Sequence, residues 1–158
     1  MNNKLPAAIG VTVILVIAVW NCATTPTDAE YEALLQKYTS THKVIIKGKV
    51  RKTWVIDHGC GVLYLDSIRS TIPYFSPFDL KENVFMYYVK GNVAELYISG
   101  LGAFMPGDSV VFNTNTDSLY SYRAGVVYNA WSLGLFNTDH SWGDDYYGEI
   151  KKVHGAKY

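Results

Sequence analysis

Residues 43–57 read KVIIKGKVRKTWVID, and this stretch indicates the fold class of the domain that follows. Apolar side chains recur at even positions, namely Val44, Ile46, Val50, Trp54 and Ile56. Cations recur at odd positions, namely Lys43, Lys47, Lys49 and Arg51. A period of two predicts a long β-strand with one buried face and one exposed, cationic face. Gly48 lies inside this strand and predicts a bulge or a bend there.

The cationic face of this strand has two interpretations. Its four cations could contact the phosphates of anionic lipid headgroups or of glycans. Alternatively, they lie on an edge strand and prevent edge-to-edge association of sheets. Residues 124–150, by contrast, hold four acidic residues and no Lys or Arg. Over the whole chain, 14 Lys and Arg balance 14 Asp and Glu, and this zero net charge argues against a nucleic-acid binder.

Short apolar stretches separated by turn residues continue to the C-terminus. We expect strands at residues 62–65, 84–89, 93–98, 110–112, 120–122, 126–131 and 149–153. Gly91-Asn92 favours a two-residue hairpin between two of them. Because no helical crossover intervenes, the strands should pair antiparallel. The sequence therefore predicts a mainly β domain over residues 43–158, either a small antiparallel barrel (OB-like or SH3-like) or a sandwich.

A short helix should precede the strands. Thr27 and Glu30 have the spacing of a capping box, whose side chains accept hydrogen bonds from the first N–H groups of a helix. The apolar residues that follow repeat at helical spacing, namely Tyr31, Leu34, Leu35 and Tyr38. This pattern predicts an amphipathic helix over residues 28–39 that packs on the sheet as a lid, with a partner-binding helix as the alternative. Residues 23–42 thus comprise a tether and this helix.

Residues 1–22 have the layout of an export signal. Met1–Lys4 is polar with one cation, Leu5–Trp20 is almost wholly apolar, and Cys22 follows soon after. Over residues 4–23 this pattern resembles the signal of bacterial lipoproteins, which implies cleavage and lipidation at Cys22. An uncleaved N-terminal anchor and an ordinary cleaved signal peptide are the alternatives. Each places the rest of the chain outside the cytoplasm, membrane-anchored in the first two cases, on the periplasmic or cell-surface side.

Two cysteines, Cys22 and Cys60, are too few for a disulfide framework or a four-cysteine zinc site. Cys60 lies in the stretch Asp57-His58-Gly59-Cys60-Gly61. A catalytic thiol needs a base within hydrogen-bond reach, and His58 and Asp57 are close in sequence. The flanking glycines fit an ordinary turn with a buried cysteine, which is our main interpretation; a metal ligand is the third. We expect no cofactor.

Residues near the C-terminus offer two further candidate ligand sites. Three carboxylates could hold calcium in an irregular loop, namely Asp139, Asp144 and Asp145. An aromatic cluster could stack against sugar rings, namely Trp131, Phe136, Trp142, Tyr146 and Tyr147. The alternatives are a solvated acidic loop and a set of core side chains.

These features favour a membrane-tethered, exported β domain that acts as a non-catalytic binding or assembly module of the bacterial cell envelope. We expect contacts with the membrane through the N-terminus and with an envelope protein complex or a glycan, and none with nucleic acid. An envelope enzyme that uses the Cys60 thiol with His58 is one alternative. A carbohydrate-binding module that uses the aromatic cluster is the other.

Overall fold

The protein is mainly β, with one helix before the strands. The computed structural model describes residues 28–80, 84–137, 149–152 and 154. Helix α2 spans Asp28–Thr41. The strands are β1 (Ile45–Asp57), β2 (Cys60–Ser70), β3 (Tyr74–Phe75), β4 (Val84–Phe85), β5 (Tyr87–Lys90), β6 (Val93–Ile98), β7 (Ser109–Asn113), β8 (Ser118–Arg123), β9 (Val126–Trp131) and β10 (Phe136–Asn137). Two 3-10 turns, η1 (Pro77–Asp79) and η2 (Leu101–Ala103), lie between strands.

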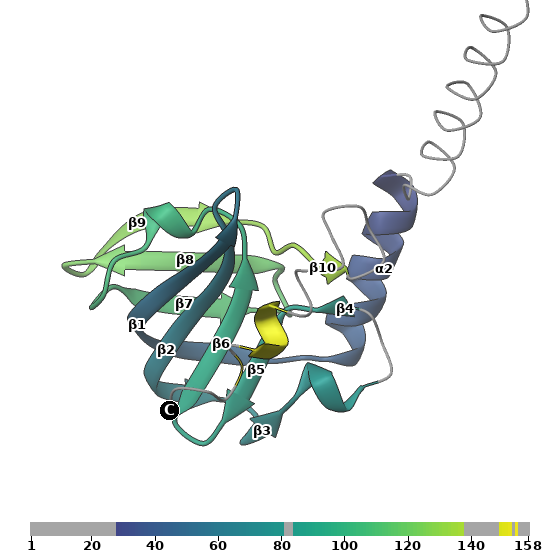
Figure 1. The fold of residues 1–158 in the computed structure, drawn as a ribbon, viewed down its shortest axis with the longest axis horizontal. Helices are drawn as coiled ribbons and strands as arrows, with labels where there is room; N and C mark the ends of the chain where they lie inside the picture. Colours follow the sequence, from purple (N-terminus) through teal and green to yellow (C-terminus); the bar gives the residue numbers. More distant parts are fainter. Residues whose placement is uncertain (1–27, 81–83, 138–148, 153, 155–158) are drawn as a thin grey trace, which may run out of the picture. The chain divides into compact units, whose positions relative to one another are not determined.

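Eight strands form one antiparallel sheet in the order β3-β5-β6-β2-β1-β7-β8-β9 (Figure 1), while β4 pairs with β10 separately. The prediction of an antiparallel, mainly β domain is therefore confirmed. The small OB-like or SH3-like barrel is wrong, because β3 and β9 end the sheet and do not pair with each other over the described residues. A sandwich would need a second sheet of comparable size, whereas β4 and β10 have two residues each.

The strand expected at residues 149–153 is also wrong, because residues 149–152 form a helical turn. The backbone N–H of His154 donates to the carbonyl of Ile150 at 2.8 Å. This hydrogen bond is local, so that N–H is satisfied without a neighbouring strand. A strand that could have helped to close the sheet is thus replaced by a turn that packs on it.

The other expected strands are present; β6 and β9 have the expected ends, and the ends of the others differ. The stretch 84–89 is split at Met86 into β4 and β5. The hairpin between β5 and β6 is confirmed, because Lys90 pairs with Val93 and Gly91 has a φ of 61°. Glycine adopts this positive φ without the penalty that a side chain would add.

Strand β1 bends at Gly48, as the sequence predicts. Its pairing with β7 ends at Lys49, while its pairing with β2 continues to the hairpin turn. The register with β2 shifts between Lys47 and Lys49. A side chain at Gly48 would bring its Cβ to 2.7 Å from Cγ2 of Ile68, so a larger residue would push the two strands apart.

A second register shift, between Val50 and Lys52, overturns part of the predicted alternation. It inserts Arg51 as an extra residue, so the side chains that follow exchange faces. Val50 is buried as expected, but Trp54 is 38% exposed. Lys52 instead lies with its ammonium 4.4 Å from the centre of the Tyr64 ring.

One face of the large sheet, here called the core face, is fully covered along its central strands. Ala94, Leu96 and Ile98 of β6 share this face, as their spacing predicts. Its buried members include Ile46, Val50, Leu63, Leu65, Tyr87, Leu96 and Phe112. Burial of such side chains contributes about 1.5–3 kcal/mol each, which is the main source of stability for the sheet.

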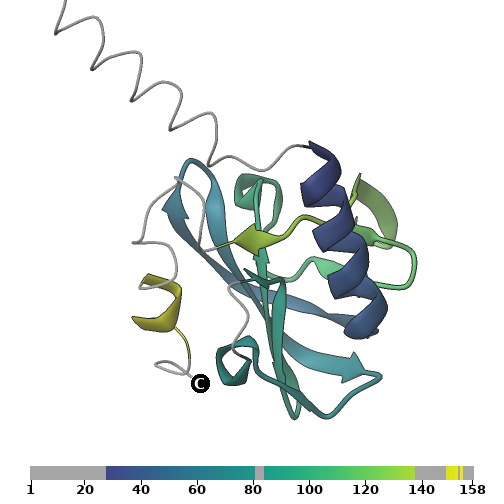
Figure 2. The ribbon, with the colours of Figure 1, turned by 90° about the vertical axis from the view of Figure 1, so that its right-hand side faces the viewer.

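The chain divides into two compact units, residues 1–33 and 34–158, with the boundary inside α2. In the second unit, the C-terminal half of α2 packs on the core face (Figure 2). Leu35 and Tyr38 are buried there. The predicted helix is confirmed, and it ends two residues later than expected, at Thr41.

The opposite side of the sheet, the outer face, is covered at one end and open at the other. Over β2, β5 and β6 it is covered by the helical turn at residues 149–152 (Figures 1 and 2). Over β1, β7, β8 and β9 its side chains are exposed or half-buried; Ser109 is exposed while its neighbour Val110 on the core face is buried. The two halves of the outer face therefore differ in their exposure to solvent.

Candidate functional site

The open half of the outer face carries an ordered array of polar and apolar side chains. We call it the open outer face, and it comprises Lys47, Lys49, Ser109, Val111, Tyr120, Tyr122, Val127 and Ala130. These residues form two rows across the strands, because residues paired in an antiparallel sheet project from the same face. One row runs from Lys47 to Ala130 and the next from Lys49 to Val127. Each row crosses three strand gaps, or about 14 Å.

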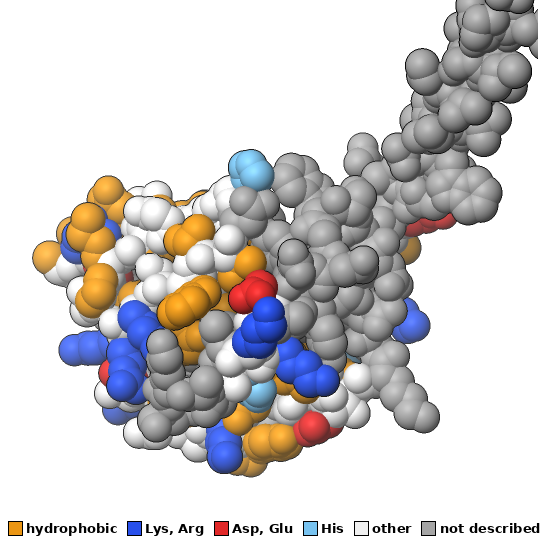
Figure 3. Space-filling view, in the orientation of Figure 1, with side chains coloured by type: hydrophobic (Ala, Val, Ile, Leu, Met, Phe, Trp, Pro, Cys, Tyr) orange, Lys and Arg blue, Asp and Glu red, His pale blue; other side chains and the backbone are white. Residues whose placement is uncertain are grey.

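Cations gather at the β1 end of this face. Lys47 and Lys49 are exposed, and Arg69 of β2, which pairs with Lys47, is exposed as well. Asp66, opposite Lys49, is the acidic member of the same two rows. Figure 3 shows the Lys and Arg side chains over β1 and β2, with hydrophobic side chains towards β8 and β9.

The four predicted cations are all exposed, but they do not share one strand face. Lys47 and Lys49 lie on the open outer face through their pairing with β7. Lys43 precedes β1, and Arg51 is the extra residue at a register shift. The sheet therefore brings two of the four together and adds Arg69, which lies far along the chain.

An apolar tip adjoins this face at the turn between β8 and β9. It consists of Val126, Val127 and Tyr128, whose exposed fractions are 69%, 52% and 54%. Arg123 supports it, since the guanidinium lies 4.1 Å from the centre of the Tyr128 ring. Three consecutive exposed apolar side chains are unusual for a soluble surface, where single ones are common.

Arg123 is fixed by a two-point ion pair. Its Nε donates to Oδ1 of Asp108 at 2.9 Å and its Nη2 donates to Oδ2 at 2.7 Å. Oδ2 also accepts the backbone N–H of Met105 at 2.9 Å. The hydrogen bonds from Arg123 hold the pKa of Asp108 below its usual range. The apolar tip is thus attached to a rigid, charge-paired base.

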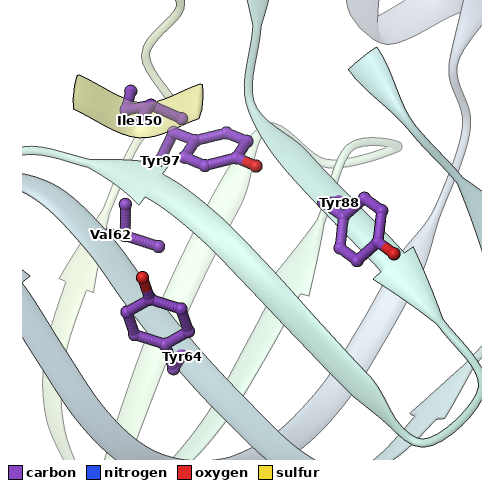
Figure 4. Packing of buried hydrophobic residues seen from close by; sticks show 5 residues of the cluster. All are labelled: Val62, Tyr64, Tyr88, Tyr97 and Ile150. Carbon is purple, nitrogen blue, oxygen red and sulfur yellow. The ribbon is translucent and has the colours of Figure 1, made fainter. Parts of the chain in front are cut away.

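A buried carboxylate lies under the covered half of the outer face. Glu95 of β6 is 0% exposed and lies between Tyr64 of β2 and Tyr88 of β5 in register. Its Oε2 accepts a hydrogen bond from the hydroxyl of Tyr97 at 2.9 Å. Figure 4 shows the neighbouring side chains of the same face, with Ile150 of the helical turn near Tyr97 and Val62. A buried carboxylate is costly unless its oxygens are hydrogen-bonded, so this one is held by its partners.

His154 is another side-chain partner of Glu95. Its Nδ1 lies 3.2 Å from Oε2 of Glu95, and its ring centre lies 4.3 Å from those of Phe78 and Tyr88. At this distance the imidazole and the carboxylate are hydrogen-bonded to each other. Desolvation, with the Glu95 charge second, raises the pKa of Tyr64 to about 12. Through these two ring contacts and the contact with the buried carboxylate, His154 fastens the end of the helical turn to the sheet.

This cluster was not predicted from the sequence. Glu95 and Tyr97 alternate with the apolar residues of β6, which normally places such side chains in solvent. A usable signal was the tyrosine excess on neighbouring strands, with Tyr64, Tyr88 and Tyr97 in otherwise apolar stretches. Which strands are neighbours depends on the sheet order, so the meeting of these residues could not be foreseen.

The Asp57–Gly61 stretch forms the turn between β1 and β2. His58 and Gly59 have φ values of 43° and 78°, and Cys60 pairs with Asp57. Cys60 is half-buried rather than buried. A turn is what the glycines predicted, and Cys60 begins strand β2. The geometry thus agrees with the predicted turn.

Of the aromatic cluster, Trp131 lies on the core-face side of β9. Its ring stacks on Phe104 with centres 4.9 Å apart and planes at 25°. The other members and the candidate calcium ligands lie outside the residues whose side chains are described, namely Phe136, Trp142, Tyr146, Tyr147, Asp139, Asp144 and Asp145. One ring face of Trp131 is therefore already covered, which leaves less surface for a sugar.

Cys22 and the rest of residues 1–22 also lie outside the described residues. Within the described part of the chain, no helix is both long and apolar enough to span a membrane. The same residues hold no group of three or more His, Cys, Asp or Glu side chains that could bind a metal ion. A comparison with models of known protein families, with curated proteins and with solved structures finds no match to this chain.

Proposed function

We propose that this chain is a membrane-tethered, exported β domain that acts as a non-catalytic binding or assembly module of the bacterial cell envelope. The observation that carries the proposal is the open outer face. It presents cations beside tyrosine and valine side chains on hydrogen-bonded strands, whereas the core face and the rest of the outer face are covered. A surface with fixed, chemically mixed side chains is what a binding module requires. The lipoprotein-like signal over residues 4–23 supplies the tether.

The two alternatives have less support. A Cys60 enzyme needs a base positioned on the thiol, and Cys60 lies in a hairpin turn without a helix N-terminus. A carbohydrate module needs free ring faces, and Trp131 already stacks on Phe104.

The experiment is an intact-mass measurement on the protein extracted from membranes with detergent. A mass equal to residues 22–158 plus acyl groups is expected for wild type, and Cys22→Ala should abolish it. A chain that begins at Met1 and stays in the soluble fraction would overturn the proposal. Alkylation of the native protein is the second readout: slow reaction at Cys60 agrees with a binding module, whereas one rapid adduct would favour the thiol enzyme.

A further inference from the structure

We infer that the open outer face docks on an anionic lipid bilayer, with the apolar tip in the interfacial region of the lipid. The inference rests on the proposed tether, because it takes as its partner the bilayer that anchors the chain. It goes further in naming the surface, the chemistry of the partner and the orientation of the sheet.

Charge complementarity is the first argument. Lys47, Lys49 and Arg69 are exposed within two adjacent rows of one sheet face, and Asp66 is the acid among them. Arg51 is exposed nearby on β1. Anionic headgroups attract each cation near the surface enough to strengthen binding about fivefold. A phosphate-rich plane can engage Lys47, Lys49 and Arg69 together, because their strand pairing places them on one side of the sheet.

The apolar tip is the second argument. Val126, Val127 and Tyr128 are each more than half exposed, and Val127 belongs to the same row as Lys49. Tyrosine favours the boundary between lipid and water, where its ring is buried and its hydroxyl stays hydrated. The Arg123–Asp108 pair holds this tip in place, so little conformational freedom is lost on insertion.

The reach of the chain is the third argument. Twelve residue steps separate Cys22 from Leu34, where the compact unit that holds the sheet begins. Twelve residues span at most about 43 Å even when fully extended. The tether therefore keeps the open outer face at a high effective concentration near the bilayer, and weak individual contacts suffice for docking.

The test uses the full chain reconstituted in two sets of vesicles, one of phosphatidylcholine alone and one with about a third phosphatidylglycerol. Flotation measures attachment to the vesicles. Acetylation of Lys47 and Lys49, and amide exchange at residues 126–128, measure docking of the face. We expect the rates of acetylation and of amide exchange to fall at least fivefold on the anionic vesicles only. High salt should restore both rates.

Charge reversal provides the matched comparison. Lys47→Glu with Lys49→Glu should weaken docking at least about 25-fold, so that residues 126–128 exchange on anionic vesicles as fast as on neutral ones. Lys37→Glu with Lys90→Glu makes the same charge change at exposed sites off the open outer face and should leave protection intact. If the first variant fails to fold, the docking is tested by the wild type alone: protection on anionic vesicles that high salt does not remove would overturn it.

The other outcomes separate the two proposals. Flotation with both vesicles but no protection would overturn the docking and leave the tether. Flotation with anionic vesicles alone would keep the docking and overturn the tether. Equal protection on neutral vesicles would overturn recognition of anionic lipid. Protection by soluble glycerol phosphate polymer as strong as by vesicles would make a phosphate-bearing glycan the partner instead.

Discussion

Replacing His154 by alanine should detach the C-terminal turn from the sheet and destabilise the fold. The imidazole contacts the buried carboxylate of Glu95 at 3.2 Å and packs between Phe78 and Tyr88 at 4.3 Å from each ring centre. Alanine removes all three contacts at once. Glu95 would keep the Tyr97 hydroxyl at 2.9 Å but lose its imidazole partner.

The magnitude follows from those contacts. A hydrogen bond to a charged group contributes about 1.5–3 kcal/mol, and two ring contacts add about 0.5–1.5 kcal/mol each. The His154 side chain is 21% exposed, so water can replace part of what is lost. We therefore expect the free energy of unfolding to fall by about 2–4 kcal/mol, a range typical for breaking a partly buried polar contact.

The assay is urea unfolding of the full chain in mild detergent, followed by near-UV circular dichroism of the tyrosine cluster. Lys152→Ala is the matched control, because it removes an exposed ion pair with Glu149 from the same helical turn. Such pairs contribute at most about 1 kcal/mol. The reasoning is refuted if His154→Ala costs no more than Lys152→Ala.

A double-mutant cycle separates the polar contact from the ring packing. Glu95→Gln combined with His154→Ala should show a coupling energy of about 1–3 kcal/mol. A coupling near zero would mean that ring packing alone holds the turn in place, and the role assigned to Glu95 would be wrong.

Three further changes test other parts of the fold. Gly61→Ala would place a Cβ 2.1 Å from the Trp54 carbonyl oxygen, so thermal unfolding should show that the free energy of unfolding falls by more than about 2 kcal/mol. Gly102→Ala is the control, because the space around Gly102 is open and the loss of stability should be far smaller. Because the pKa of Asp108 is lowered, its stabilisation is present above pH about 4 and is lost on acidification; Asp108→Asn should destabilise the protein at pH 7 and flatten the acid limb of a urea-midpoint titration. The pKa of Tyr64 is raised to about 12, so the unfolded chain loses this proton at a lower pH than the folded protein does, and stability should fall as pH rises from about 10 towards 12. Tyr64→Phe should reduce by about one the number of protons released on unfolding in this pH range. An unchanged curve of stability against pH would contradict the burial of this hydroxyl.

Local patterns predicted the secondary structure well because they report on local physics. The alternation around Val44 and Ile46 required only that one strand face be buried, and both are 0% exposed. It failed at Trp54, because the inserted Arg51 depends on how β1 aligns with β2. A register shift is a property of two strands, and neither strand encodes it alone.

The candidate sites also combine features that local sequence predicts with features that depend on strand pairing. The turn at His58-Gly59 was visible in the sequence, since glycine adopts the positive φ that a tight hairpin needs. Only part of the open outer face was predicted from the sequence, namely the cations of β1. Tyr120 and Tyr122 belong to the same face only because β7 pairs with β8.

The sequence by itself determined a mainly β domain, the helix before it, the bend at Gly48 and the cations of β1, because each depends on residues within a few positions of one another. Only the tertiary structure decided that the sheet stays open, that residues 149–152 form a turn, and that Glu95 is buried with His154. Those features depend on contacts between residues far apart in the chain. Their stability comes from burial and paired hydrogen bonds, which no local pattern specifies.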